Sequence, residues 1–342
     1  PAGEMSLYTS SMNSSESNDY RLRMYVTEEY NPQGDGGGLT FTVKVNVYGK
    51  AGDKPLTGAE MLIEKANPED LDYNSATDEE KKEMWTHTHP ETEQTEALTD
   101  YRYIGTDPNN YVQFNDEEWR IIGVFTVDDG TGNKEERLKI TRNRAVTGNY
   151  AWDTSNSNDW TNSTIKTILN SGDYWTNKLT IEAKEMIGDA VWYLGGTSTY
   201  TSDDNGLVSH WYSYERGTNV YPGRSTFWIG KVGLMYPSDI GYAVSGGLTT
   251  DRTTCLEKNI YNGRMSFPDC YNSDWFYGSW QWTITPGSND SRTVFRAGDV
   301  SDINPDSASN SDPSIYPAVY LKSSIKIVDG DGSSSNPYIL QS

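Results

Sequence analysis

The stretch from Trp211 to Ala243 reads WYSYERGTNVYPGRSTFWIGKVGLMYPSDIGYA. Aromatic residues, glycines and short apolar pairs alternate there with single charged residues, without a helical period. This pattern predicts the aromatic core of an irregular domain. We expect the leading end, His210 to Arg216, to form a loop beside an acidic turn at Asp203 and Asp204, and any binding site to lie there. The middle part should be buried: Phe227, Trp228, Ile229, Val232, Leu234 and Met235.

The composition of the whole chain fits an aromatic core. Only 35% of the 342 residues are hydrophobic, but 11 are Trp and 24 are Tyr. Since one aromatic side chain can bury roughly 150–250 Å², these rings must supply much of the interior. The net charge of −21 repels phosphate backbones and argues against nucleic acid as a partner. No apolar run approaches the ~20 residues that span a bilayer.

Residues 1–52 predict a short antiparallel β segment. Tyr20 to Val26 and Thr40 to Tyr48 alternate between apolar and polar residues, and the glycine-rich segment 34–38 separates them. Two strands alone are only marginally stable, so we expect them to pair with further sequence, with another subunit or with the rest of this chain.

Residues 53–97 are rich in acidic residues and proline, which is typical of a solvated linker, with one or two helical turns at Ala59 to Lys65. His87 and His89 are candidate metal ligands within it, but their spacing in an acidic segment favours the interpretation without metal.

From residue 98 to 342 the sequence predicts an α+β domain with long loops. Its strands and two short helices follow from local periodicity, and the Asp128 to Asn133 segment predicts a hairpin turn. The second helix should direct Ile181, Met186 and Ile187 inward, and residues 299–314 should form a loop. The predicted elements are 111–114, 119–125, 137–141, 163–169 (helix), 180–188 (helix), 190–194, 294–295, 316–321 and 325–328.

The N-terminal strands resemble the closing strands of TasA/camelysin-type β-sandwich proteins, which Gram-positive bacteria secrete and which assemble into fibres. The resemblance covers about residues 1–50. It rests on a Tyr-x-Leu-Arg-x-x-Val strand followed by Phe-x-Val-Lys-Val-x-Val.

The second domain resembles a family of C-type-lectin-like modules on Gram-positive bacterial surface proteins. The resemblance covers about residues 98–342, and it implies fold and location but no activity. The wider fold includes formylglycine-generating enzymes. The similar strings are NYVQFNDEEWRIIGV (110–124), WTNSTIKTILN (160–170), GKVGLMYPSDIGYA (230–243), WTITP (282–286) and YPAVYLKSSIKIVDGDGSSSNPYIL (316–340).

The two cysteines, Cys255 and Cys270, predict a disulfide rather than a metal site, since a metal normally needs three or four ligands and no histidine is near in sequence. A disulfide places the protein outside the cytoplasm, at the cell surface or secreted. Two free thiols are the alternative. Because the chain begins at Pro1 without a methionine, we expect a processed or truncated form.

Calcium is a cofactor alternative. The acidic turns hold the candidate ligands Asp203, Asp204, Asp329 and Asp331, but Asp-Gly is also a common turn signal and no EF-hand glutamate follows. No metal is therefore expected.

No enzyme is expected. His210 is the only histidine of the second domain, it lacks a Gly-x-Ser-x-Gly elbow, and the cysteines do not form an oxidase copper site. Aromatic rings that stack on sugars are the more plausible site residues, although each could instead belong to the core. The candidates are Trp211, Tyr212, Tyr214, Trp275, Tyr277, Trp280 and Trp282.

The sequence therefore predicts an extracellular structural or adhesive surface protein. Its N-terminal strands would mediate fibre-like or pilus-like assembly with other copies or with cell-surface proteins, by strand addition. Its second domain would be displayed outward. The alternative is a carbohydrate-binding module that recognises glycans.

Overall fold

The computed structural model describes residues 55–198, 206–261, 268–270, 274–276, 280–298 and 302–342. The chain divides into Pro1–Asp53 and Lys54–Ser342, and the described residues all belong to the second of these units. The strands expected at 20–26 and 40–48 lie outside the described residues, and so do Asp203, Asp204 and Tyr277.

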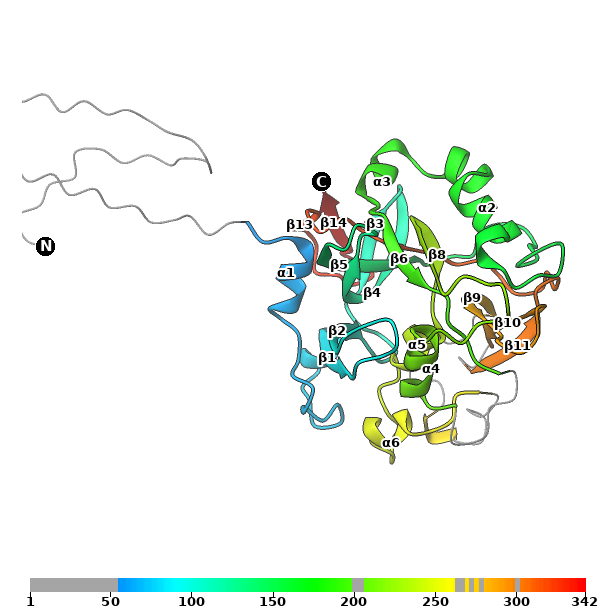
Figure 1. Cartoon of the computed structure of the whole chain (residues 1–342). Coiled ribbons are helices and arrows are strands. Elements are labelled where there is room, and N and C mark those ends of the chain that lie inside the picture. Colours follow the sequence, from blue (N-terminus) through cyan, green and yellow to red (C-terminus); the bar gives the residue numbers. More distant parts are fainter. Residues whose placement is uncertain (1–54, 199–205, 262–267, 271–273, 277–279, 299–301) are drawn as a thin grey trace, which may run out of the picture. The chain divides into compact units, whose positions relative to one another are not determined.

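A large mixed sheet lies in the middle of the unit that begins at Lys54 (Figure 1). Its strands run in the order β13-β14-β3-β4-β5-β12-β8, and the hairpin β1–β2 joins it through β4. All of its pairs are antiparallel except β14 with β3. The strands are β1 (Met84–His89), β2 (Leu98–Tyr103), β3 (Tyr111–Phe114), β4 (Glu117–Asp128), β5 (Lys134–Arg142), β8 (Val232–Leu234), β12 (Pro317–Tyr320), β13 (Lys326–Asp329) and β14 (Tyr338–Gln341).

Two smaller sheets and several short helices complete the described part. One sheet has three strands in the order β11-β10-β9, and the other consists of β6 and β7. The strands are β6 (Ala190–Tyr193), β7 (Phe227–Gly230), β9 (Gln281–Pro286), β10 (Thr293–Ala297) and β11 (Ile303–Ser307). The helices are α1 (Gly58–Ile63), α2 (Thr164–Asn170), α3 (Ile181–Met186), α4 (Val208–Glu215), α5 (Pro237–Gly241) and α6 (Arg252–Leu256), with short turns η1 (Glu80–Lys82), η2 (Trp160–Asn162), η3 (Tyr174–Lys178) and η6 (Pro268–Cys270).

Strand β4 is the centre of the large sheet. Every residue from Trp119 to Phe125 is buried, as expected for a strand covered on both faces. β3 and β2 share one edge of β4, and β5 occupies the other. At Gly123 the backbone of the neighbouring strand β2 is so close that a Cβ atom would lie 2.1 Å from the carbonyl oxygen of Tyr101. Glycine is therefore required where β4 passes from β3 to β2.

The coarse α+β expectation is confirmed, with strands dominating. The Asp128–Asn133 segment forms the predicted hairpin turn between β4 and β5, with left-handed φ at Gly130 and Gly132. The predicted aromatic core is also confirmed. Its fully buried tryptophans are Trp119, Trp152, Trp160, Trp192, Trp211 and Trp282.

The linker interpretation of residues 53–97 is wrong for the described part, from Pro55 on. This segment supplies α1 and β1, and it buries Leu62, Met84 and Trp85. Its acidic side chains, such as Asp70 and Asp78, occupy the exposed positions between the buried ones. The folded unit therefore begins near residue 54 rather than 98.

The expectation that Phe227, Trp228, Ile229, Val232, Leu234 and Met235 are buried is wrong at Phe227 and Ile229, and Trp228 is only half-buried. Val232, Leu234 and Met235 are buried, but Phe227 and Ile229 are 45% and 44% exposed. Within the described ranges, strand β7 pairs with β6 alone, and side chains alternate along a strand. Its two outward positions therefore face solvent, while Trp228 packs on Trp160 with ring centroids 5.7 Å apart.

Three further local expectations are corrected. His210 to Arg216 lies mostly in helix α4 rather than in a loop. Part of the loop expected at 299–314 is strand β11. Ile181 is 69% exposed because it begins α3 on the outer side, whereas Ile187 is buried as expected.

Candidate functional site

Most of the aromatic residues expected to bind a ligand are placed in the core or covered. Trp211, Tyr212 and Trp282 are buried, so they have no free face for a sugar. Trp275 stacks on Phe276 at 3.6 Å. Among the described candidates Trp280 is exposed, but Arg296 covers one face of its ring at 4.0 Å.

Tyr214 is the candidate that the structure places at a surface hollow. We call this hollow of about 570 Å³ the Tyr214 hollow. It lies between the chain before β2, the C-terminal end of α4 and the segment after β6. Its lining residues are Glu91, Thr92, Glu93, Gly196, Ser213, Tyr214, Gly217 and Asn219.

The segment 91–95 is bound to the end of α4 by side-chain and backbone hydrogen bonds. The Gln94 amide donates to the carbonyl oxygens of Gly217 and Thr226 at 2.7 and 3.2 Å, and the backbone N–H of Gln94 donates to Arg216. Glu93 accepts from the backbone N–H and the hydroxyl of Thr218. These hydrogen bonds therefore fix segment 91–95, which forms one wall of the hollow, against the residues that follow α4.

The two glycines after β6 allow the opposite wall to approach closely. A Cβ atom on Gly195 would lie 2.3 Å from the carbonyl oxygen of Tyr214 and 2.4 Å from that of Gly217. On Gly196 it would lie 2.0 Å from the carbonyl oxygen of Pro286. A larger residue at position 195 would collide with the end of α4, and one at position 196 would collide with Pro286, so either would change the hollow.

The chemistry of the Tyr214 hollow is polar and acidic. Its lining combines carboxylates, hydroxyls and an amide with one half-buried aromatic ring, and none of its lining side chains is cationic. Hydrogen bonds from Thr218 lower the pKa of Glu93 below its ordinary value, so this carboxylate stays charged. Such a surface suits a neutral or cationic ligand rich in hydroxyl groups and repels an anionic one.

A buried group of charged residues lies deeper in the domain. We call Asp100, Arg102, Lys139, Glu215, Arg216 and Asp239 the ionic cluster; none is more than 5% exposed. Arg102 joins two carboxylates, donating to Asp100 at 2.8 Å and to Asp239 at 3.1 Å. Lys139 donates to the second oxygen of Asp239 at 2.5 Å. Burial of such charges is tolerated only when they are paired in this way.

The electrostatics of the cluster follow from its geometry. Burial opposes ionisation of Asp239, but the charges of Lys139 and Arg102 together lower its pKa. Burial lowers the pKa of Lys139 to about 8, although Asp239 attracts its proton. The pKa values of both partners can be lowered together because Asp239 faces two cations. Lys139, in contrast, has one carboxylate partner and lies in the field of two arginines.

The second half of the cluster fixes helix α4 against helix α5. Glu215 accepts from the backbone N–H and hydroxyl of Ser238, at 2.8 and 2.5 Å. Burial raises its pKa to about 7, against the opposing charge of Arg216. The guanidinium group of Arg216 lies 3.7 Å from the ring of Tyr212, which stacks on His89 at 3.6 Å.

A cavity of about 20 Å³ beside Arg216 and Asp100 has room for about one water molecule.

The sequence analysis did not predict the ionic cluster, but the spacing of apolar residues in 208–215 could have predicted helix α4. Its buried residues Val208, Trp211, Tyr212 and Glu215 have the i, i+3, i+4, i+7 spacing of a helix. The pattern was hidden because its fourth member is a charged residue. In the ionic cluster, Arg216 directly follows Glu215, but Asp100 and Arg102 lie on β2, Lys139 on β5 and Asp239 on α5, which are far apart in sequence.

His89 is a buried core residue and His87 is half-buried beside it, so neither is an exposed ligand. His89 is 2% exposed, and its Nε2 atom lies 2.9 Å from Asp100. The His87 ring packs edge-on against Tyr242 at 4.3 Å. Over the described ranges, no group of three or more His, Cys, Asp and Glu residues is arranged to hold a metal ion.

The remaining candidates lie in a turn and on helix α4. Asp329 and Asp331 lie at the turn between β13 and β14, and each accepts a hydrogen bond from a nearby backbone N–H. His210 lies on α4, with its ring 6.2 Å from that of Tyr214. No helix of the described residues is long and apolar enough to cross a membrane.

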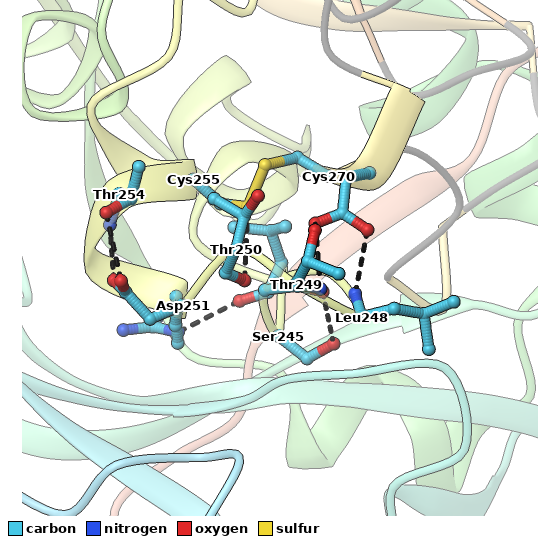
Figure 2. The surroundings of a disulfide bond; sticks show 12 residues. Ser245, Leu248, Thr249, Thr250, Asp251, Thr254, Cys255 and Cys270 are labelled. Carbon is cyan, nitrogen blue, oxygen red and sulfur yellow. Dashed lines mark hydrogen bonds between the residues drawn. A yellow bond between two sulfur atoms is a disulfide. The ribbon is translucent and has the colours of Figure 1, made fainter.

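Cys255 and Cys270 form the predicted disulfide, with their Cα atoms 5.7 Å apart (Figure 2). The bond joins α6 to η6. Asp251 caps α6 by accepting from the backbone N–H of Thr254. Asp269 accepts from the backbone N–H groups of Leu248 and Thr249, so the crosslinked loops are also held by hydrogen bonds.

Comparisons of the chain with protein-family models, with curated proteins and with solved structures gave no match.

Proposed function

We propose that this chain is an extracellular structural or adhesive protein of a bacterial surface, and that its folded unit binds a carbohydrate in the Tyr214 hollow. The hollow itself carries the proposal. It combines an aromatic ring that can stack on a sugar with carboxylate, hydroxyl and amide groups that can hydrogen-bond sugar hydroxyls.

The disulfide supports the extracellular part of the proposal, because such bonds persist mainly in oxidising compartments. Display of the folded unit is proposed from the resemblance of the strings in residues 98–342 to C-type-lectin-like surface modules. Assembly through the N-terminal strands remains a prediction from their alternating sequence, and calcium remains a candidate cofactor of binding.

We propose no catalytic role for the residues that the structure describes. The buried carboxylates and cations of the ionic cluster are paired with one another, and the cavity beside them has room for about one water molecule. A substrate could not reach these groups without opening the core. The Tyr214 hollow therefore offers a place for recognition, with no matched acid and base.

A glycan array tests this proposal, with the full chain applied in the presence and absence of calcium. Neutral or amino sugars should bind and anionic ones should not, because the lining is acidic. Replacing Tyr214 with alanine should weaken binding about fivefold or more, since loss of a stacking ring is worth about 1 kcal/mol or more.

The matched control is Tyr221→Ala, which removes a half-buried tyrosine that does not line the hollow. It should leave binding unchanged. Absence of any bound glycan under both conditions would leave the structural role and reject the carbohydrate site. Equal losses in both variants would mean that the sugar binds elsewhere.

A further inference from the structure

Lys139 and Asp239 meet in the interior although 100 residues separate them in sequence. Lys139 lies on β5, where it pairs with Tyr320 of β12. Asp239 lies in the first turn of α5. The Lys139 Nζ atom is 2.5 Å from Oδ2 of Asp239, and the two side chains are 0% and 1% exposed. The amine and the carboxyl group are thus in contact and shielded from water.

Four aromatic rings enclose this pair. The Nζ atom of Lys139 lies 4.4 Å from the ring centroid of Tyr236 and 5.2 Å from that of Tyr320. The rings of Phe125 and Trp192 follow at 5.4 and 5.5 Å. Water hydrolyses amides and favours separated ions, so its exclusion favours a neutral, covalent product over two buried charges.

Arg102 occupies the position that a condensation would need. Its Nη1 atom donates to Oδ1 of Asp239, while its Nη2 atom donates to Asp100. A positive group at Oδ1 stabilises the negative charge that develops on that oxygen when a nucleophile attacks the carboxyl carbon. Arg102 remains paired with Asp100 when the other two charges disappear, so the interior stays balanced.

We propose that Lys139 and Asp239 condense to an intramolecular amide bond that crosslinks strand β5 to helix α5. One ammonium proton passes from Nζ to Oδ2, and the free amine attacks Cγ of Asp239. The bond from Cγ to Oδ2 then breaks, a second proton from the nitrogen joins Oδ2, and this oxygen leaves as water. Oδ1 becomes the amide carbonyl oxygen and keeps its hydrogen bond from Arg102. No oxidant, metal or cofactor takes part.

The charge state of the lysine is compatible with this step. Burial lowers the pKa of Lys139 to about 8, so the neutral amine is accessible near neutral pH. The neighbouring Arg102 and Arg216 act in the same direction. An exposed lysine would instead hold its proton and its hydration shell.

The mass of the denatured full chain, after reduction of the disulfide, tests the proposal. The crosslinked protein should be lighter than its sequence by one water molecule. Trypsin should leave Lys139 uncut and yield a branched peptide in which residues 138–142 are joined to residues 232–252. A mass equal to that of the sequence, with separate peptides, would show an ion pair only and overturn the proposal.

The pair Lys134 and Glu96 is a matched control within the same chain. Its N···O distance is also 2.5 Å, but its side chains are 45% and 66% exposed. The peptides that contain these residues should therefore be unlinked. A link there as well would mean that crosslinking is an artefact of sample handling, and the inference from burial would fall.

Two further measurements assign the reaction to these residues. The variants Lys139→Met and Asp239→Ala should each have the full mass of their sequences. The wild-type chain, purified in denaturant before it has folded, should also have its full mass and lose one water on refolding. A water lost in either variant, or none lost on refolding, would overturn the assignment; the wild-type result stands even if a variant fails to fold.

Discussion

At the scale of single residues, the two histidines of β1 show how burial decides chemistry. His87 and His89 were candidate metal ligands in the sequence, but the fold places them among aromatic rings and beside arginines. Burial, reinforced by Arg252, lowers the pKa of His87 to about 2. Burial also lowers the pKa of His89, although Asp100 opposes this. Both side chains are therefore neutral in the folded protein.

These neutral histidines make stability depend on pH. In the unfolded chain each has a pKa of about 6.5, so below that value the unfolded state binds protons that the folded state does not. Because the pKa of His87 falls to about 2 in the folded protein, this residue should lower the free energy of unfolding by about 1.4 kcal/mol per pH unit as the pH drops below about 6. His89 acts in the same direction, and replacing His87 with phenylalanine should remove the contribution of His87 to the slope.

Urea denaturation of both proteins between pH 7 and pH 5 measures the difference. The carboxylates are common to both proteins, so their contribution cancels when the two curves are subtracted. Parallel curves for wild type and His87→Phe would mean that His87 takes up its proton in the folded state.

At the scale of elements, the edge strand β8 is closed by a side chain. The amide group of Asn170, at the end of α2, donates to the carbonyl oxygen of Val232 at 2.8 Å and accepts from its N–H at 3.0 Å. The side chain thereby imitates one residue of a neighbouring strand. Open edges are templates for pairing with other chains, and this contact blocks one of them.

Removal of this contact should weaken the domain. Asn170→Ala leaves an N–H and a C=O of β8 without their partner, which should lower the free energy of unfolding by about 1–3 kcal/mol in urea denaturation. Asn177→Ala is the control, because the side chain of Asn177 contacts only the exposed Asp173 in the described structure, and its loss should have little effect. Equal effects would contradict the role of the edge contact.

At the scale of the whole molecule, stability depends on the redox environment. The disulfide closes a loop with a sequence separation of 15 and joins α6 to the segment near Asp269. Both sulfur-bearing residues are buried and form their own small cluster with Val244. The large sheet is built from other residues, so we expect it to survive loss of the bond.

The double replacement of Cys255 and Cys270 by serine should lower the free energy of unfolding by about 3 kcal/mol, because the unfolded chain regains the entropy of the loop. Urea denaturation with and without a reductant measures this. The wild type should lose stability in the reductant and the variant should not respond. A wild type that is indifferent to the reductant would show that the bond contributes nothing to stability.

The candidate site shows where sequence reasoning stops. The residues 210–216 were the right place to search, since Ser213 and Tyr214 line the hollow, but the segment is a helix and most of its rings are buried. Glu91, Thr92 and Glu93 belong to a segment that its acidic composition assigned to a linker. Thr92 and Glu93 are held there by hydrogen bonds with Arg216 and Thr218, more than 120 positions away, and no local pattern encodes such contacts.

The sequence by itself determined what depends on neighbouring residues. The strands β3, β4 and β5 follow from short-range periodicity, the Asp-Gly turn from its backbone preference, and the disulfide from the presence of only two cysteines. Tertiary structure alone decided which rings became core, because burial depends on what packs on each face of a strand or helix. It also decided that Lys139, Arg102 and Asp239 share one dry site. Their attraction is strong only where water is excluded, and only the complete fold excludes it.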